Sequence, residues 1–189
     1  MKWTEYLTKF EDVLEGRNQE HPYNDPTYVE YVKLNTSRQN RWLKKGALTE
    51  ETKTILDKVV CHQKWILIAE PWCGDAANIA PIIDLMAEYS GKIDFEIELR
   101  DDSDLINSYL TNGGKAIPKL VARDENNEDV FVWGPRPAAC QNMVMEMKTS
   151  DLSPLEKKTE IQKWYNTNKG EDIQREISEL LNASCMAKL

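Results

Sequence analysis

One strand-to-helix junction constrains the fold of this chain more than any other segment. Residues 65–69 form a short, apolar, β-prone run that Pro71 bounds, so they predict a buried strand. Apolar residues then recur at the 3.6-residue period of an amphipathic helix, at Ile79, Ile82, Ile83, Met86 and Ala87. Cys73 therefore lies where the strand turns into the helix. Unpaired backbone N–H groups and the positive end of the helix dipole favour a thiolate there, so we expect a lowered thiol pKa.

The size and charge of the chain limit what it can bind. Its 189 residues suit one domain with added elements, and two full domains are not expected. A net charge of −8 argues against a nucleic-acid or anionic-membrane surface, because both need clustered Lys and Arg. The first residues lack the apolar core of a signal peptide, and no later segment has the character of a membrane span. We therefore expect a cytoplasmic protein whose partners are neither nucleic acid nor membrane.

The cysteines show no paired spacing. They stand at positions 61, 73, 140 and 185, and a reducing compartment would keep most of them as thiols. Cys140 shares an apolar helical face with Met143 and Met147, which predicts a small buried residue. Neither histidine stands at zinc-ligand spacing from a cysteine pair, and no phosphate-binding loop is present. We expect no metal and no cofactor.

Helices are predicted at both ends of the chain. Before about residue 60, Asp25 and Pro26 open one helix that Gly46 ends, and a second helix follows it. After about residue 150, Ser153 and Pro154 open the first of two further helices.

The middle of the chain alternates strands with helices. Residues 93–99 alternate apolar and acidic side chains, which is the pattern of a strand with one solvated face. The other expected elements are a short helix over 104–110, strands over 117–122 and 130–133 that form a hairpin, and a helix that carries Cys140.

This order, β-α-β-α-β-β-α over residues 65–148, resembles the thioredoxin family. Three motifs agree with that family: Trp72-Cys73-Gly74 at the first junction, Pro81 eight residues after the cysteine, and Ile117-Pro118 at the start of the third strand. The chain looks most like a bacterial subgroup with WCGDA in place of WCGPC. The resemblance implies an α/β protein with the thioredoxin fold, a mixed four-stranded sheet and a cis peptide bond before Pro118. The expected parts are an N-terminal helical extension over 1–60, a thioredoxin-like domain over 61–150 and a C-terminal helical extension over 151–189.

The second cysteine of the family motif is replaced by Ala76. Thioredoxins attack a disulfide with the first cysteine and release the product with the second, so Cys73 is left as the only nucleophile. Our first hypothesis is monothiol thiol–disulfide exchange by Cys73, resolved by a thiol from a protein or a small molecule. Asp75 would tune the thiol by raising its pKa. The alternative is a redox-inactive thioredoxin-fold module that binds proteins, and a third possibility is a cycle in which Cys140 supplies the missing thiol.

The resemblance also implies a substrate-binding surface around the cysteine. In the family, the residue before the cis-proline presents its backbone to an extended peptide, and a glycine after the hairpin approaches the cysteine. The matching residues here are Ile117, Pro118 and Gly134. The motif residues Trp72 and Gly74 complete this expected surface.

Two arginines are candidates for charge at this surface. Arg136 follows Gly134 and is expected either to stabilise a thiolate or to hold a substrate carboxylate or phosphate. Arg100 follows the second strand, so it is expected at the same sheet edge as Cys73, although the role of a solvated loop charge is favoured for it.

Overall fold

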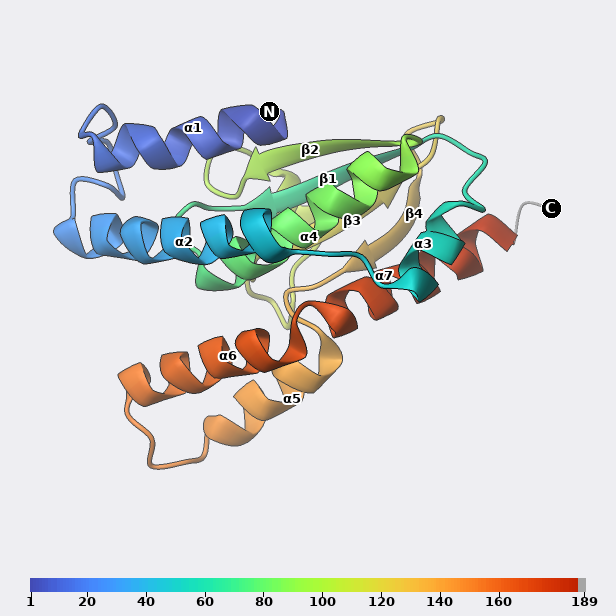
Figure 1. Ribbon diagram of the computed structural model, residues 1–189. Coiled ribbons are helices and arrows are strands. Elements are labelled where there is room, and N and C mark those ends of the chain that lie inside the picture. The colour runs from blue at the N-terminus through green and yellow to red at the C-terminus, as the bar shows by residue number, and fades with distance from the viewer. Residues whose placement is uncertain (187–189) are drawn as a thin grey trace.

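The computed structural model describes residues 1–186, which form a four-stranded sheet surrounded by helices (Figure 1). The helices are α1 (Trp3–Leu14), α2 (Pro26–Lys45), α3 (Glu50–Leu56), α4 (Gly74–Ser90), α5 (Ala138–Met147), α6 (Pro154–Asn168) and α7 (Glu171–Met186). The strands are β1 (Gln63–Ala69), β2 (Ile93–Leu99), β3 (Lys119–Arg123) and β4 (Asp129–Trp133), with a 3₁₀ turn, η1, at Leu105–Ser108.

The sheet is mixed, as predicted. Its order is β2-β1-β3-β4, with β1 parallel to β2 and antiparallel to β3, and with β3 antiparallel to β4. β1 is a central strand and almost completely buried, which explains its continuous apolar sequence. β2 lies at an edge and keeps the predicted alternation of buried apolar and more exposed acidic residues.

α4 begins at the carboxyl end of β1 and carries the apolar face that the sequence predicted. Ile79, Ile82, Ile83 and Met86 are 1 % exposed or less. Pro81 lies inside the helix, and the left-handed Gly91 ends it. The junction therefore holds residues 70–76 at one end of the sheet.

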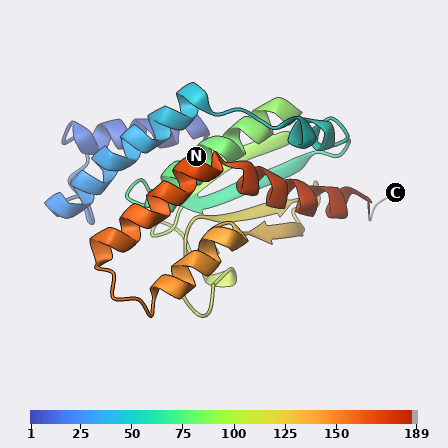
Figure 2. The same ribbon diagram turned by 60° about the horizontal axis from the view of Figure 1, so that its bottom comes forward.

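The helices outside the β-α-β-α-β-β-α core pack against it. α1 lies along β2, and the Met1 amino group donates a 2.8 Å hydrogen bond to Ile97 O. α2 crosses the first turns of α4, and α7 lies beside β4 (Figure 1). Figure 2 shows α6 between α2 and α5. Within the described residues, no helix combines the length and apolar character that crossing a membrane needs.

Three local predictions differ from the structure. The helix expected over 104–110 is only the short 3₁₀ turn Leu105–Ser108. The third strand begins at Lys119 and not at residue 117, because Pro118 has no N–H to donate to a ladder. Gly46 ends α2 as predicted, but in an extended conformation with φ −64° and not in the left-handed conformation typical of such glycines.

Candidate functional site

Cys73 is the N-cap residue of α4, as the junction predicted. Its Sγ donates a 3.5 Å hydrogen bond to Ile117 O, and the peptide bond between Ile117 and Pro118 is cis. The structure therefore brings the cysteine and the proline loop, 44 residues apart in sequence, into direct contact.

The thiol of Cys73 is buried, and the residue is only 7 % exposed. Burial, and then the charge of Asp75, raise its pKa to about 12, although the backbone N–H groups of Ala76 and Asp75 and the guanidinium of Arg136 act in the opposite direction. The lowered pKa expected from the helix start is therefore not found. Desolvation outweighs the helix terminus, because burial penalises the charged form more than a few N–H groups stabilise it.

Asp75 is held by two other segments. Its Oδ2 forms a 2.6 Å ion pair with Arg136 Nη2, and its Oδ1 accepts a 2.9 Å hydrogen bond from the hydroxyl of Tyr165 on α6. Arg136 also donates to Gln141 Oε1 at 3.0 Å. Arg136 thus binds a carboxylate of the protein itself, and α6 is tied to the first turn of α4.

On the other side of the motif, α2 covers Gly74. A Cβ atom at Gly74 would lie only 2.8 Å from Arg38 Nη1, so the guanidinium lies directly against the glycine. Arg38 Nη1 donates to Asn35 Oδ1, and Asn35 Nδ2 donates to Pro71 O, both at 2.8 Å. A side chain at this position would displace the end of the Arg38 side chain.

Trp72 and Arg100 form the more accessible part of the site. The Arg100 guanidinium lies 4.8 Å from the centroid of the Trp72 ring, and Tyr28 packs edge-on against the same ring. Arg100 also makes two 2.8 Å hydrogen bonds to the carboxylate of Asp101. Arg100 therefore lies at the predicted edge, where it stacks on Trp72.

Glu70 and Tyr6 are two further buried polar residues near the thiol. Glu70 Oε1 accepts a 3.1 Å hydrogen bond from Asp101 N, and burial raises the Glu70 pKa to about 7. The Tyr6 hydroxyl, from α1, has no hydrogen-bond partner among the described residues. Burial, and then the charges of Cys73 and Glu70, raise the pKa of Tyr6. The N-terminal helix thus helps to cover the site.

Gly134 approaches the backbone of the proline loop, whereas the resemblance implied an approach to the cysteine. It has φ +109°, and a Cβ atom there would lie 2.5 Å from Pro118 O. Its carbonyl accepts a 3.0 Å hydrogen bond from Lys119 Nζ. No residue with a side chain could occupy this position without moving the backbone of Pro118.

Cys140 is fully buried, as its helical face predicted. Burial, and then the charge of Asp75, raise its pKa to about 12. The side chain of Cys185 lies outside the described residues. Within the described part, no group of three or more His, Cys, Asp or Glu side chains is placed to hold a metal ion.

The covering residues were missed by the sequence analysis. Arg38, Tyr6 and Tyr165 lie on helices outside the β-α-β-α-β-β-α core, and their contacts with the motif are made only in the tertiary structure. Asn35 is buried on α2 and Arg38 lies one turn later on the same helix, but no local pattern in the sequence places Arg38 against Gly74.

Comparison with known proteins agrees with this geometry. The sequence model of a family described as thioredoxin matches residues 23–148, which includes α2 and α3. A Pseudomonas aeruginosa protein described as of unknown function has a similar structure, with a TM-score of 0.56, 17 % identity and 86 % of each chain covered. An HIV epitope-scaffold is also similar, with a TM-score of 0.57, 14 % identity, and 97 % of this chain and 99 % of the scaffold covered. At these identities the two structures show a shared fold, and the match to the sequence model shows that the chain belongs to the thioredoxin family.

Proposed function

We propose that this protein is a thioredoxin-fold binding module that has lost redox turnover. The observation that carries the proposal is the state of Cys73: its thiol is buried, donates to Ile117 O and has a pKa of about 12. Burial raises the pKa of this thiol, which lowers the fraction of thiolate at pH 7, and the thiolate is the reactive species. Ala76 also leaves no second thiol in the motif to complete a turnover.

The proposed partner is a protein that contacts the accessible rim of the site. Ile117 and Pro118 are buried, so the strand edge expected to dock a peptide is covered. Trp72, with Arg100 stacked on it, remains partly accessible and combines an aromatic face with a cation. Aromatic residues and arginines contribute strongly to protein interfaces.

Monothiol exchange is the second candidate, and one observation favours it. The sulfur of Cys73 lies beside the proline loop and receives stabilisation from the N–H groups of Asp75 and Ala76 and from Arg136. In this reaction the Cys73 thiolate attacks a substrate disulfide, forms a mixed disulfide and releases one substrate thiolate. An external thiolate then attacks the Cys73 sulfur of the mixed disulfide, releases the second substrate thiolate and remains bonded to Cys73. A second external thiolate attacks the outer sulfur, forms a disulfide between the two external thiols and releases the Cys73 thiolate. The covering contacts from α2 and α6 would have to open first.

Alkylation of Cys73 distinguishes the two candidates. Iodoacetamide is applied across pH 6–10, and the Cys73 peptide is followed by mass spectrometry, with unfolded protein as the positive control. The binding proposal expects almost no labelling of folded protein at pH 7 to 8 and rapid labelling after unfolding. Rapid labelling of the folded protein with a midpoint below pH 8 would contradict it and support exchange.

A small aromatic disulfide gives an independent test. The protein and its Cys73→Ser variant are each mixed with the disulfide, and the release of the coloured thiol is followed by its absorbance. Mass spectrometry then identifies which cysteines have formed a mixed disulfide. Under the binding proposal the two proteins release thiol at the same rate. A release that depends on Cys73 would contradict the loss of redox chemistry.

A further inference from the structure

The chain has seven arginines, and the structure gives five of them a carboxylate partner. The paired arginines are Arg17, Arg100, Arg123, Arg136 and Arg175. Arg38 and Arg41 have no ion pair with any described carboxylate. Both lie on α2, three residues apart, so the two unpaired guanidinium groups are neighbours on one face of the helix.

Both groups are partly buried. Arg38 lies against Gly74 and donates only to the neutral Asn35. Arg41 donates to the neutral Asn166 on α6, and its Nη2 is buried and has no hydrogen-bond partner among the described residues. Burial lowers the pKa of both arginines. Arg41 also stacks on the Trp42 ring, 4.8 Å from its centroid. Two adjacent, partly desolvated cations without an ion-pair partner are unfavourable, because buried charges need a partner and like charges on one helix face repel.

The nearby carboxylate of Asp75 acts on Arg38 and raises its pKa against the effect of burial, but it forms no ion pair with Arg38 within the described residues. Its two oxygens bind Arg136 and Tyr165 instead. The contact between α2 and α6 therefore keeps an excess of positive charge in a chain whose net charge is −8. A bound anion would supply the counter-charge.

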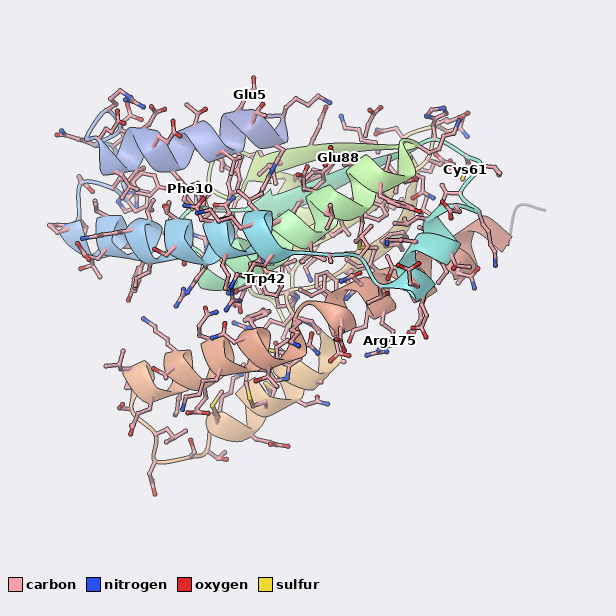
Figure 3. All side chains as sticks on the ribbon, viewed as in Figure 1. Glu5, Phe10, Trp42, Cys61, Glu88 and Arg175 are labelled. Carbon is pink, nitrogen blue, oxygen red and sulfur yellow. The ribbon has the colours of Figure 1, made fainter. Side chains whose placement is uncertain are left out.

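A cavity adjoins Arg41, the second of these arginines. It measures about 500 Å³ and lies between the end of α2 and the turn from α6 to α7. Three cations line it, Arg41, Lys45 and Lys169, against the single carboxylate of Glu171. Trp42 forms an apolar wall, and in Figure 3 it lies between the end of α2 and the end of α6. This volume is in the range of small-molecule sites, and it combines an aromatic surface with a few charged groups.

We propose that a small organic anion binds between α2 and α6. Its carboxylate or phosphate oxygens would accept hydrogen bonds from Arg38 and Arg41, and its body would lie in the cavity against Trp42. The cavity size favours a small molecule over a nucleic acid or a membrane surface, both of which need a wider cationic area. The proposed contacts come from α2 and α6 and do not include the Cys73 thiol.

The structure also places a reporter in the site. The Trp42 indole N–H donates to Asn78 Oδ1 at 3.0 Å, and Asn78 Nδ2 donates to Gly74 O at 2.9 Å. A ligand on the Trp42 ring would therefore shift the resonance of its indole N–H. The Arg38 and Arg41 side-chain N–H resonances would report the anion directly.

The test is an NMR titration of the full chain with inorganic phosphate and, separately, with citrate, at an ionic strength held constant with sodium chloride. We expect saturable shifts at Arg38, Arg41 and Trp42 with at least one of the two probes. Saturation by phosphate alone assigns a phosphate ligand, and saturation by citrate alone assigns a carboxylate. Shifts that stay linear with both probes and match those of sodium chloride would overturn the proposal.

Charge variants make the test specific. Arg38→Gln and Arg41→Gln should each weaken binding by about tenfold, since a charge-assisted hydrogen bond is lost. Arg17→Gln removes the same charge from an exposed site in the connection between α1 and α2 and should bind as the unchanged chain does. Lys45 lines the cavity at an exposed position, so Lys45→Gln tests whether the cavity takes part in binding without disturbing the fold.

Unchanged binding by Arg38→Gln and Arg41→Gln would overturn the proposal. Cys73→Ala should bind normally, so failure of this site is distinguishable from failure of the redox-inactive proposal.

Discussion

The carboxyl group of Glu70 is buried at the end of β1, three residues before Cys73, and its pKa is raised to about 7. The folded protein therefore holds a proton on Glu70 at pH values where the unfolded chain, with a pKa near 4.5, has lost it. The contribution of this group to stability is fully present below about pH 4.5 and is lost as the pH rises through 7. Asp84, which is more exposed, is shifted in the same direction.

We expect Glu70→Gln to make the protein less sensitive to pH. The amide oxygen can still accept the Asp101 N–H, so the free energy of unfolding at pH 8 should rise by about 2 kcal/mol relative to the unchanged chain, with little change at pH 4.5. Urea unfolding at both pH values measures this. Glu96→Gln is the control, because Lys64 lowers the Glu96 pKa and gives the opposite pH dependence. An unchanged pH profile in Glu70→Gln would contradict the assignment.

Two glycines allow the cost of a steric contact with a neighbouring backbone to be separated from the cost of a positive φ angle. Gly134 and Gly113 both have positive φ, but only at Gly134 would a Cβ atom meet backbone, 2.5 Å from Pro118 O. Gly113→Ala should cost about 1 kcal/mol for the left-handed conformation alone. Gly134→Ala should cost about 2 kcal/mol more, because the proline loop must move. Thermal unfolding of the two variants measures the difference, and equal losses would show that the contact with Pro118 is unimportant.

At the scale of elements, α6 has an unexpected role, because it closes the site that the core elements build. The Tyr165 hydroxyl joins α6 to Asp75 in the first turn of α4, two residues from the thiol. The cysteine's surroundings therefore depend on a helix outside the β-α-β-α-β-β-α core. Without that helix, the carboxylate of Asp75 would lose its hydrogen bond from Tyr165 and keep the ion pair with Arg136.

Tyr165→Phe should loosen this cover. Loss of the hydrogen bond to Asp75 is expected to cost about 1 kcal/mol and to raise the population of open molecules, and with it Cys73 alkylation, about fivefold. Tyr31→Phe is the matched control, since its hydroxyl contacts Lys158 on the same α6 but at an exposed place. The measurement is the labelling rate of the Cys73 peptide at pH 9. Equal rates in the two variants would show that α6 does not control access.

At the scale of the whole molecule, the terminal helices are joined to the sheet by specific bonds. The Trp133 indole donates to Glu176 on α7 at 2.8 Å, and Thr49 N donates to Gln174 Oε1 on α7 at 2.9 Å. Ile173 and Ile177 of α7 are fully buried. The boundaries 1–60, 61–150 and 151–189 remain predictions, but these contacts indicate a shared core.

The whole chain is therefore expected to unfold in one transition. Far-ultraviolet circular dichroism reports the helical content, and tryptophan fluorescence reports the core. The two signals should give the same midpoint in urea, because the terminal helices and the sheet bury one another. An early loss of helical signal, with the fluorescence of the core unchanged, would show instead that the terminal helices unfold as separate units.

The sequence by itself determined the architecture and the members of the motif. Continuous apolarity marked β1, the 3.6-residue period marked α4, and the Ile117-Pro118 pair identified the cis bond through family resemblance. These signals are local, so periodicity and motif spacing reveal them. The weaker predictions failed where local signals were short, as at residues 104–110.

Only the tertiary structure decided the state of the cysteine. The helix start that favours a thiolate is visible in the sequence, but the burial that outweighs it comes from packing by distant segments. Arg38 and Tyr165 reach the motif from helices on either side of it in the chain, and no local pattern encodes that approach. A pKa depends on every group around an atom, and contacts between distant segments exist only once the chain has folded.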